Sequence, residues 1–210
     1  MTRQTQGVPR VARGRNKRLV LSRLFSICVL AAALLSRPVY PDDSFLAWML
    51  GITGYLALVV GSCTRAWSAV FIAGHKNARV VTEGPYSIVR HPLYLGNLLA
   101  FLGAGLLLQS FVLSLALAVA FAITHWPAMR AEERHLTERF GARYVAYTHS
   151  VPAFVPAPSH LQTPATLVVD VKVLTRMLFE AALVMLVLPL AEGIRLLHQL
   201  HLVPTVLHLW

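Results

Sequence analysis

Apolar stretches alternate with short polar segments along most of the chain. Residues 1–18 are polar and basic, and apolar runs follow at about 19–36 and 44–61. Each run approaches the roughly 20 residues that a helical membrane span requires. We therefore predict two membrane spans within residues 19–63.

A longer apolar stretch covers residues 93–127 and is interrupted at its centre by Gln109 and Ser110. As helices, its halves of about 16–18 residues would each be roughly 24–27 Å long, close to the hydrocarbon thickness of a bilayer. The pattern predicts a helical hairpin. A hairpin returns the chain to the same membrane face, so the polar segments 64–92 and 128–149 should lie together.

Residues 128–149 are charged and have a helical pattern. Apolar and aromatic side chains recur at steps of three, four and seven and form one stripe: Met129, Leu136, Phe140, Tyr144 and Tyr147. Glu133 falls inside this stripe and Glu132 on its flank. A carboxylate on an apolar face is costly unless it is paired. Gly141 weakens the helix, so the last turns could form a separate element.

A loop with Pro152, Pro156, Pro158 and Pro164 leads into the C-terminal region, residues 159–210, which is ambiguous at 165–175. Its apolar run, about 177–190, spans the membrane if it continues to about Leu197 and otherwise lies in the interface. His198 and His201 have a ligand-like spacing, but neither a carboxylate nor a thiol partner is evident. We predict no metal site.

Composition supports membrane insertion. Of the 210 residues, 56% are hydrophobic and only 13% are charged, whereas about a quarter are charged in a soluble domain. The length suits one domain and leaves no room for a separate soluble catalytic domain. Cys28 and Cys63 lie in apolar runs and form no metal-binding or redox motif, so we interpret them as packing residues.

The net charge of +10 is concentrated before the first apolar run. Six basic residues precede it: Arg3, Arg10, Arg13, Arg15, Lys17 and Arg18. Such a cluster predicts a cytoplasmic N-terminus. A basic start, an apolar run and small residues at 31–33 could instead form a signal peptide. Nucleic-acid binding is disfavoured because no base-reading module follows the basic tail.

Two motifs flank the hairpin. Residues 84–96 read GPYSIVRHPLYLG, and residues 132–152 read EERHLTERFGARYVAYTHSVP. They resemble the GPYxxxRHPxYxG and EExxLxxxFGxxYxxYxxxVP segments of the isoprenylcysteine carboxyl methyltransferase family and its phospholipid methyltransferase relatives. The resemblance covers residues 80–156, within a methyltransferase-like core at 64–158. It does not extend to the first spans or to 159–210.

The resemblance implies an all-α integral membrane protein with about five transmembrane or membrane-embedded helices and a site for S-adenosylmethionine near the cytoplasmic face. It implies catalytic roles for Arg90, His91 and Glu133. It also implies the cofactor-binding residues His91, Tyr94, Gly96, Glu132, Glu133 and Tyr144.

The chemistry of these residue types fits that donor. A carboxylate suits its ammonium group or ribose diol, arginine suits its carboxylate, and tyrosine suits its ring. Structural roles are the alternatives. Arg90 could neutralise lipid phosphates or pair with the glutamates, His91 could cap the helix that Pro92 opens, and Gly96 could serve helix packing with Gly103.

The predicted function is methyl transfer to a lipid or lipidated acceptor that bears a carboxylate, phosphate or amine group. An RHP motif favours an oxygen acceptor slightly. The alternatives are an NADPH-dependent membrane reductase and a non-catalytic lipid-binding membrane protein. No Rossmann pattern supports a soluble type of methyltransferase fold.

Overall fold

The computed structural model describes most of the chain after the first apolar run. The described residues are 34, 36–37, 41, 44–75, 78–203 and 207–208. The predicted basic tail 1–18, Cys28 and almost all of the predicted span 19–36 lie outside them.

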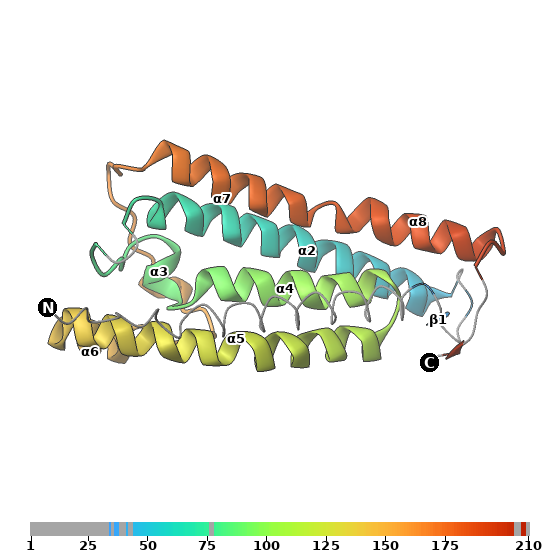
Figure 1. Ribbon diagram of the computed structural model, residues 1–210, viewed down its shortest axis with the longest axis horizontal. Helices are drawn as coiled ribbons and strands as arrows, with labels where there is room; N and C mark the ends of the chain where they lie inside the picture. The colour runs from blue at the N-terminus through green and yellow to red at the C-terminus, as the bar shows by residue number, and fades with distance from the viewer. Residues whose placement is uncertain are drawn as a thin grey trace, which may run out of the picture.

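Long helices lie side by side in the described part of the chain (Figure 1). They are α2 (Phe45–Ile72), α4 (Pro92–Leu107), α5 (Phe111–Phe140), α7 (Val171–Val184) and α8 (Val187–Gln199). The order across the bundle is α7–α8, α2, α4, α5, with α4 between α2 and α5. Each helix buries the face that packs against its neighbour, and its outward face carries apolar side chains.

Among the described residues, three helical stretches are long and apolar enough to cross a membrane: α2, α5 and the α7–α8 unit Val171–Gln199. Helix α4 is apolar but shorter. Large apolar side chains point outward from these helices, among them Trp48, Leu115, Ile123 and Phe179. A soluble protein rarely exposes so much apolar surface. The chain is an all-α integral membrane protein, as the sequence predicted.

Helices α2 and α4 approach each other through two pairs of glycines. A Cβ atom at Gly54 would lie 2.8 Å from the carbonyl oxygen of Gly103, and one at Gly61 would lie 2.6 Å from that of Gly96. Small residues let helix backbones come close where lipid provides no hydrophobic drive for association. The glycine spacing predicted helix packing, and the structure shows that the glycines of α2 face those of α4.

The predicted hairpin is formed by α4 and α5. Its turn lies at Gln109 and Ser110, the two polar residues in the centre of the apolar stretch. Gln109 has a positive φ of 55°. Ser110 caps α5 by accepting a hydrogen bond from the backbone N–H of Leu113 at 3.0 Å. Both side chains are buried, so the turn is a packed element.

Helix α5 is longer than the predicted hairpin arm. It continues through Pro127 to Phe140, whereas the sequence suggested that a separate charged helix begins near residue 128. The helix ends at Gly141, where φ is 53° and a Cβ atom would meet nothing within 4 Å, so backbone conformation alone explains the break. At about 1.5 Å per residue, α5 is roughly 45 Å long and extends past the bilayer core.

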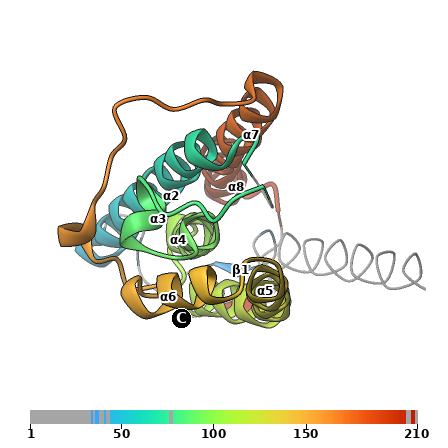
Figure 2. The ribbon, with the colours of Figure 1, turned by 90° about the vertical axis from the view of Figure 1, so that its left-hand side faces the viewer.

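Short elements gather at one end of the bundle, which Figure 2 views directly. They are α3 (Pro85–Ile88), α6 (Ala142–Ser150) and the 3-10 helix η1 (Pro158–His160). The segment from η1 to α7 passes outside α2 and α3. At the opposite end, Ser36–Arg37 (β1) and Leu207–His208 (β2) form a minimal parallel pair. The motif residues all belong to the end that carries α3 and α6.

The glycine contact predicts a specific loss of stability. Gly61→Ala places a methyl group against a backbone carbonyl of α4 and should lower the free energy of unfolding by about 1–3 kcal/mol. Gly51→Ala lies on the same helix with nothing within 4 Å, and it should be neutral or stabilising by up to about 1 kcal/mol. Thermal unfolding in detergent measures both. Equal melting temperatures for the two variants would contradict the close α2–α4 contact.

Candidate active site

Backbone hydrogen bonds tie the two motifs together. The N–H of Arg90 donates to the carbonyl of Pro152 at 2.8 Å, and the N–H of His91 donates to that of Ala153 at 3.3 Å. Pro92 then opens α4 with His91 at the N-cap, but the His91 side chain makes no capping bond. The imidazole is therefore available to other partners.

Glu133 connects both motifs through its side chain. Its Oε1 lies 3.1 Å from Nη1 of Arg90 and 3.0 Å from Nε2 of His91. The side chains are largely buried, with 18% of Arg90, 8% of His91 and 22% of Glu133 exposed. The costly carboxylate on the apolar stripe is thus paired, as its position required. Phe154 covers the imidazole at a ring-centroid distance of 5.9 Å.

Glu132 has a different environment. Its Oε2 accepts a hydrogen bond from the hydroxyl of Tyr94 at 3.2 Å. No arginine, lysine or histidine of the described residues lies within ion-pair distance of it. The Tyr94 ring is held edge-on between the rings of His91 and His125. The adjacent glutamates therefore differ: Glu133 is paired with Arg90 and His91, whereas Glu132 has no cationic partner among the described residues.

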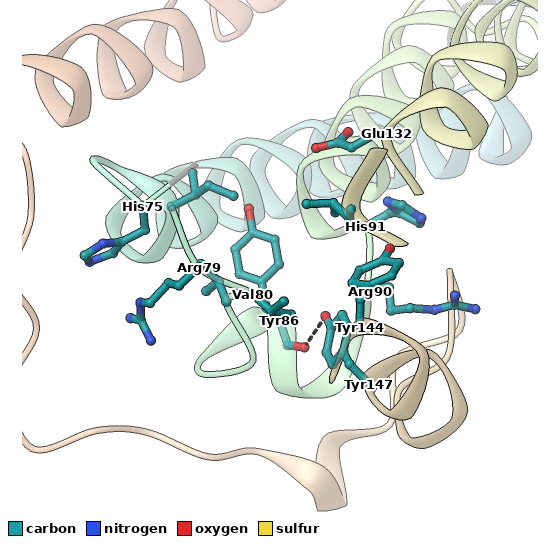
Figure 3. A pocket seen from close by; sticks show the side chains of 12 residues that line it. His75, Arg79, Val80, Tyr86, Arg90, His91, Glu132, Tyr144 and Tyr147 are labelled. Carbon is teal, nitrogen blue, oxygen red and sulfur yellow. Dashed lines mark hydrogen bonds between the residues drawn. The ribbon is translucent and has the colours of Figure 1, made fainter. Parts of the chain in front are cut away.

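Three tyrosines form the wall nearest the short elements (Figure 3). The hydroxyl of Tyr147 donates to the carbonyl of Tyr86 at 2.7 Å. Burial, and then the charge of Glu132, raises the pKa of Tyr86 well above its usual range. Burial, and then the charge of Glu133, raises the pKa of Tyr144 to about 12. Both phenols stay neutral at physiological pH and can donate hydrogen bonds.

Two cavities meet at this site. The larger is a cleft of about 540 Å³ between α2, α4, α5 and α7, within the roughly 300–1,000 Å³ typical of small-molecule sites. The smaller, about 60 Å³, lies toward α3 and α6. Both are lined by the same five residues: Ile72, Tyr86, Arg90, His91 and Glu132. Motif residues therefore form the boundary between the two spaces.

The residues singled out from the sequence take three kinds of position. Some line the cavities, namely Arg90, His91, Tyr94, Glu132 and Tyr144. Glu133 lies behind this lining and holds Arg90 and His91. Gly96 lies in the α2–α4 contact, where a Cβ atom would meet Gly61 and Arg65.

Several cavity residues were missed by sequence reasoning, among them Arg65, Tyr86, Asn97 and His125. Tyr86 stands within the GPY motif, and its buried hydroxyl has no partner among the described residues. The other three are polar residues inside apolar helices. Such residues mark functional positions in membrane proteins by default, and this signal could have identified them.

No group of three or more His, Cys, Asp or Glu side chains in the described residues could hold a metal ion. His198, one half of the ligand-like pair, instead has its Nε2 at 2.7 Å from the backbone oxygen of Leu34.

Comparison with known proteins gives consistent matches. The phospholipid methyltransferase family matches residues 46–143. A nickel-cobalt-cadmium resistance protein, NccN, of Alcaligenes xylosoxydans is 34% identical over 69% of this chain and 68% of its own length. A cobalt-zinc-cadmium resistance protein, CzcN, of Cupriavidus metallidurans is 33% identical over 75% of this chain and 73% of its own length.

Named enzymes also match. Protein-S-isoprenylcysteine O-methyltransferase B of Arabidopsis thaliana is 28% identical over 66% of this chain and 76% of its own length. No solved structure matches the chain. The family match includes the whole hairpin, the first motif and the glutamate pair.

The Tyr147–Tyr86 hydrogen bond yields a test of the tyrosine wall. Tyr147→Phe removes the buried donor and should lower the free energy of unfolding by about 1–2 kcal/mol. Tyr55→Phe changes a tyrosine that is 49% exposed on α2 and should have an effect of less than about 0.5 kcal/mol. Chemical unfolding in detergent compares them. An unchanged midpoint for Tyr147→Phe would show that the bond contributes nothing to the fold.

Proposed function

The chain belongs to the phospholipid and isoprenylcysteine methyltransferase family, and on this basis we propose that it transfers a methyl group from S-adenosylmethionine to a lipid or lipidated acceptor. Membrane methyltransferase activity follows from the family. The donor, the acceptor class and the roles of individual residues are the parts that we propose.

One observation carries the proposal: the motif residues converge on the boundary of two cavities at the end of the spans. The donor has an ammonium group, a carboxylate, a ribose diol and a sulfonium cation. Glu132 offers an uncompensated carboxylate to a positive group or the diol. The buried hydroxyl of Tyr86 has no partner among the described residues and points into the pocket opposite Glu132 (Figure 3). Both residues offer the donor a polar partner that the ion pairs of Glu133 do not occupy.

The residues of this chain position the reactants. S-adenosylmethionine, when bound, supplies a methyl group on a sulfonium centre. Glu133 fixes Arg90 and His91, so neither side chain must be ordered when ligands bind. Tyr94 holds the Glu132 carboxylate in place. The rings of Phe154 and Tyr144 exclude water from this part of the site, which strengthens each charge interaction.

The larger cleft suits an acceptor that comes from the bilayer. Its lining comes from three membrane helices, α2, α5 and α7, and from apolar α4. It therefore lies beside lipid, while the smaller cavity lies toward the polar end. In this proposal the acceptor reaches the larger cleft from the bilayer, and the donor binds against Glu132 and Tyr86, at the boundary that the two cavities share. The isoprenylcysteine O-methyltransferase names of relatives agree with an acceptor attached to a hydrophobic chain.

The site end faces the cytoplasm in this proposal. Basic residues are abundant in the polar segments there: Arg79, Arg90, Arg130, Arg134, Arg139 and Arg143. Short cytoplasmic segments of membrane proteins carry such an excess. The orientation also places the site on the same side as the predicted cytoplasmic N-terminus. Family membership favours methyl transfer over the nicotinamide-dependent reductase and the non-catalytic lipid-binding protein.

Donor binding tests the proposal directly. We expect S-adenosylmethionine and S-adenosylhomocysteine to bind the purified protein in detergent with micromolar dissociation constants, measured by calorimetry, and NADPH not to bind. Folding is checked by thermal unfolding of the same sample. Binding of NADPH alone would support the reductase instead. Binding of neither ligand to folded protein would reject the proposed donor.

The role of Glu132 gives a second test. Glu132→Gln removes the uncompensated charge and should weaken S-adenosylmethionine binding by about 10- to 100-fold, since a charge-assisted hydrogen bond contributes about 1.5–3 kcal/mol. Glu138→Gln makes the same change at an exposed position of the same helix and should leave the affinity unchanged. Equal affinities for both variants would remove Glu132 from the donor site.

A further inference from the structure

We propose that Arg65 selects the acceptor by binding its negatively charged oxygen group, a carboxylate or phosphate on a lipid-borne molecule. This inference rests on the proposed methyl transfer. It adds the residue that favours an anionic acceptor over a cationic or neutral one.

Arg65 lies in the membrane-spanning part of α2. It precedes the last residue of the helix, Ile72, by seven positions, which corresponds to about 10 Å of helix. Its side chain lines the larger cleft together with Asn97 and His125. Ionisable residues within spans are expensive and occur where they face a cavity with a function. The position therefore calls for a partner in the cleft.

The surrounding residues hold the guanidinium in one place. Nη1 of Arg65 donates to Oδ1 of Asn97 on α4. The aliphatic stem crosses the surface of α4 at Gly96, where a Cβ atom would lie 2.8 Å from Cγ of Arg65. The glycine contact between α2 and α4 thus also makes room for this arginine. A guanidinium group that is already held in position loses little conformational entropy when it binds an anion.

The charges of the cleft indicate what Arg65 binds. Two other arginines in its lining are neutralised, Arg90 by Glu133 at 3.1 Å and Arg176 by Glu180 at 3.0 Å. No carboxylate of the described residues lies within 4 Å of Arg65. Its Nε is buried and has no partner there. Among the described residues that line the cleft, Arg65 and Glu132 are therefore the arginine and the carboxylate without an ion-pair partner within 4 Å; beyond that distance, Glu180 also attracts Arg65.

These two charges complement the two reactants. Glu132 suits the cationic donor, and Arg65 suits an anionic acceptor, for which a guanidinium offers two parallel hydrogen bonds. An ammonium acceptor would be repelled by Arg65. An oxyanion needs no base: its lone pair forms the bond to the methyl carbon, the carbon–sulfur bond breaks with its electrons moving to sulfur, and no proton is transferred.

The experiment compares charged and neutral probes. Calorimetry in a neutral detergent, with S-adenosylhomocysteine at saturation, measures the binding affinity of each probe. The first pair is N-acetyl-S-farnesylcysteine and its methyl ester, and the second pair is phosphatidic acid and diacylglycerol. We expect at least one charged probe to bind about 10- to 100-fold more tightly than its neutral counterpart. The pair that shows the difference identifies a carboxylate or a phosphate as the acceptor group.

Variants then assign the difference to Arg65. Arg65→Gln should abolish the preference for the charged probe while it leaves the affinity for S-adenosylhomocysteine unchanged, which also shows that the variant is folded. Arg65→Lys should retain part of the preference, since it keeps the charge but not the fork. Arg195→Gln is the matched control. Its Nε is also buried and without a partner among the described residues, but its Nη1 is paired with Glu192 on α8, away from the cleft.

Each contrary result has its own meaning. Equal affinity for charged and neutral probes in both pairs would overturn the inference, as would a preference that survives in Arg65→Gln. Loss of S-adenosylhomocysteine binding in folded Arg65→Gln would assign Arg65 to the donor instead. Failure of the wild-type protein to bind S-adenosylhomocysteine would reject the proposed function itself, before Arg65 is tested.

Discussion

The site depends on one shared carboxylate. Glu133 contacts Arg90 and His91, which precede it by 43 and 42 residues, so it joins the segments on either side of the hairpin. A carboxylate on an apolar helix face is tolerated only when it is paired and hydrogen-bonded. That constraint determines how α5 is rotated against α4. With Glu133 turned toward Arg90 and His91, Glu132 on the neighbouring position reaches Tyr94 and the cleft.

Packing between the spans and the chemistry of the site share residues. The glycines of α2 and α4 allow the two backbones to come together in a lipid environment that does not drive helix association by hydrophobicity. The same contact leaves Arg65 and Asn97 side by side at the cleft. A larger side chain at Gly96 would therefore disturb both the helix pair and the arginine. Fold and function are coupled here through backbone proximity.

The charges around the cavities separate into paired and unpaired groups within the described part of the chain. Glu133 is paired with Arg90, and Glu180 is paired with Arg176, so these charges find their partners within the protein. Glu132 and Arg65 are left to face the cleft from α5 and α2. In a low-dielectric surrounding, each unpaired charge strongly favours a ligand group of opposite sign. This division agrees with a membrane methyltransferase and with the cationic donor that we propose.

The sequence alone determined the membrane class, the hairpin and the two motifs, because apolar run length, turn residues and residue identity are local properties. It also indicated that Glu133 needed a partner. Only the tertiary structure decided which partners each glutamate takes, since that depends on the rotation of α5 and on its continuity through Pro127. It also decided that Gly96 packs on α2 and that Arg65 reaches the cleft, because both result from contacts between segments more than 30 residues apart.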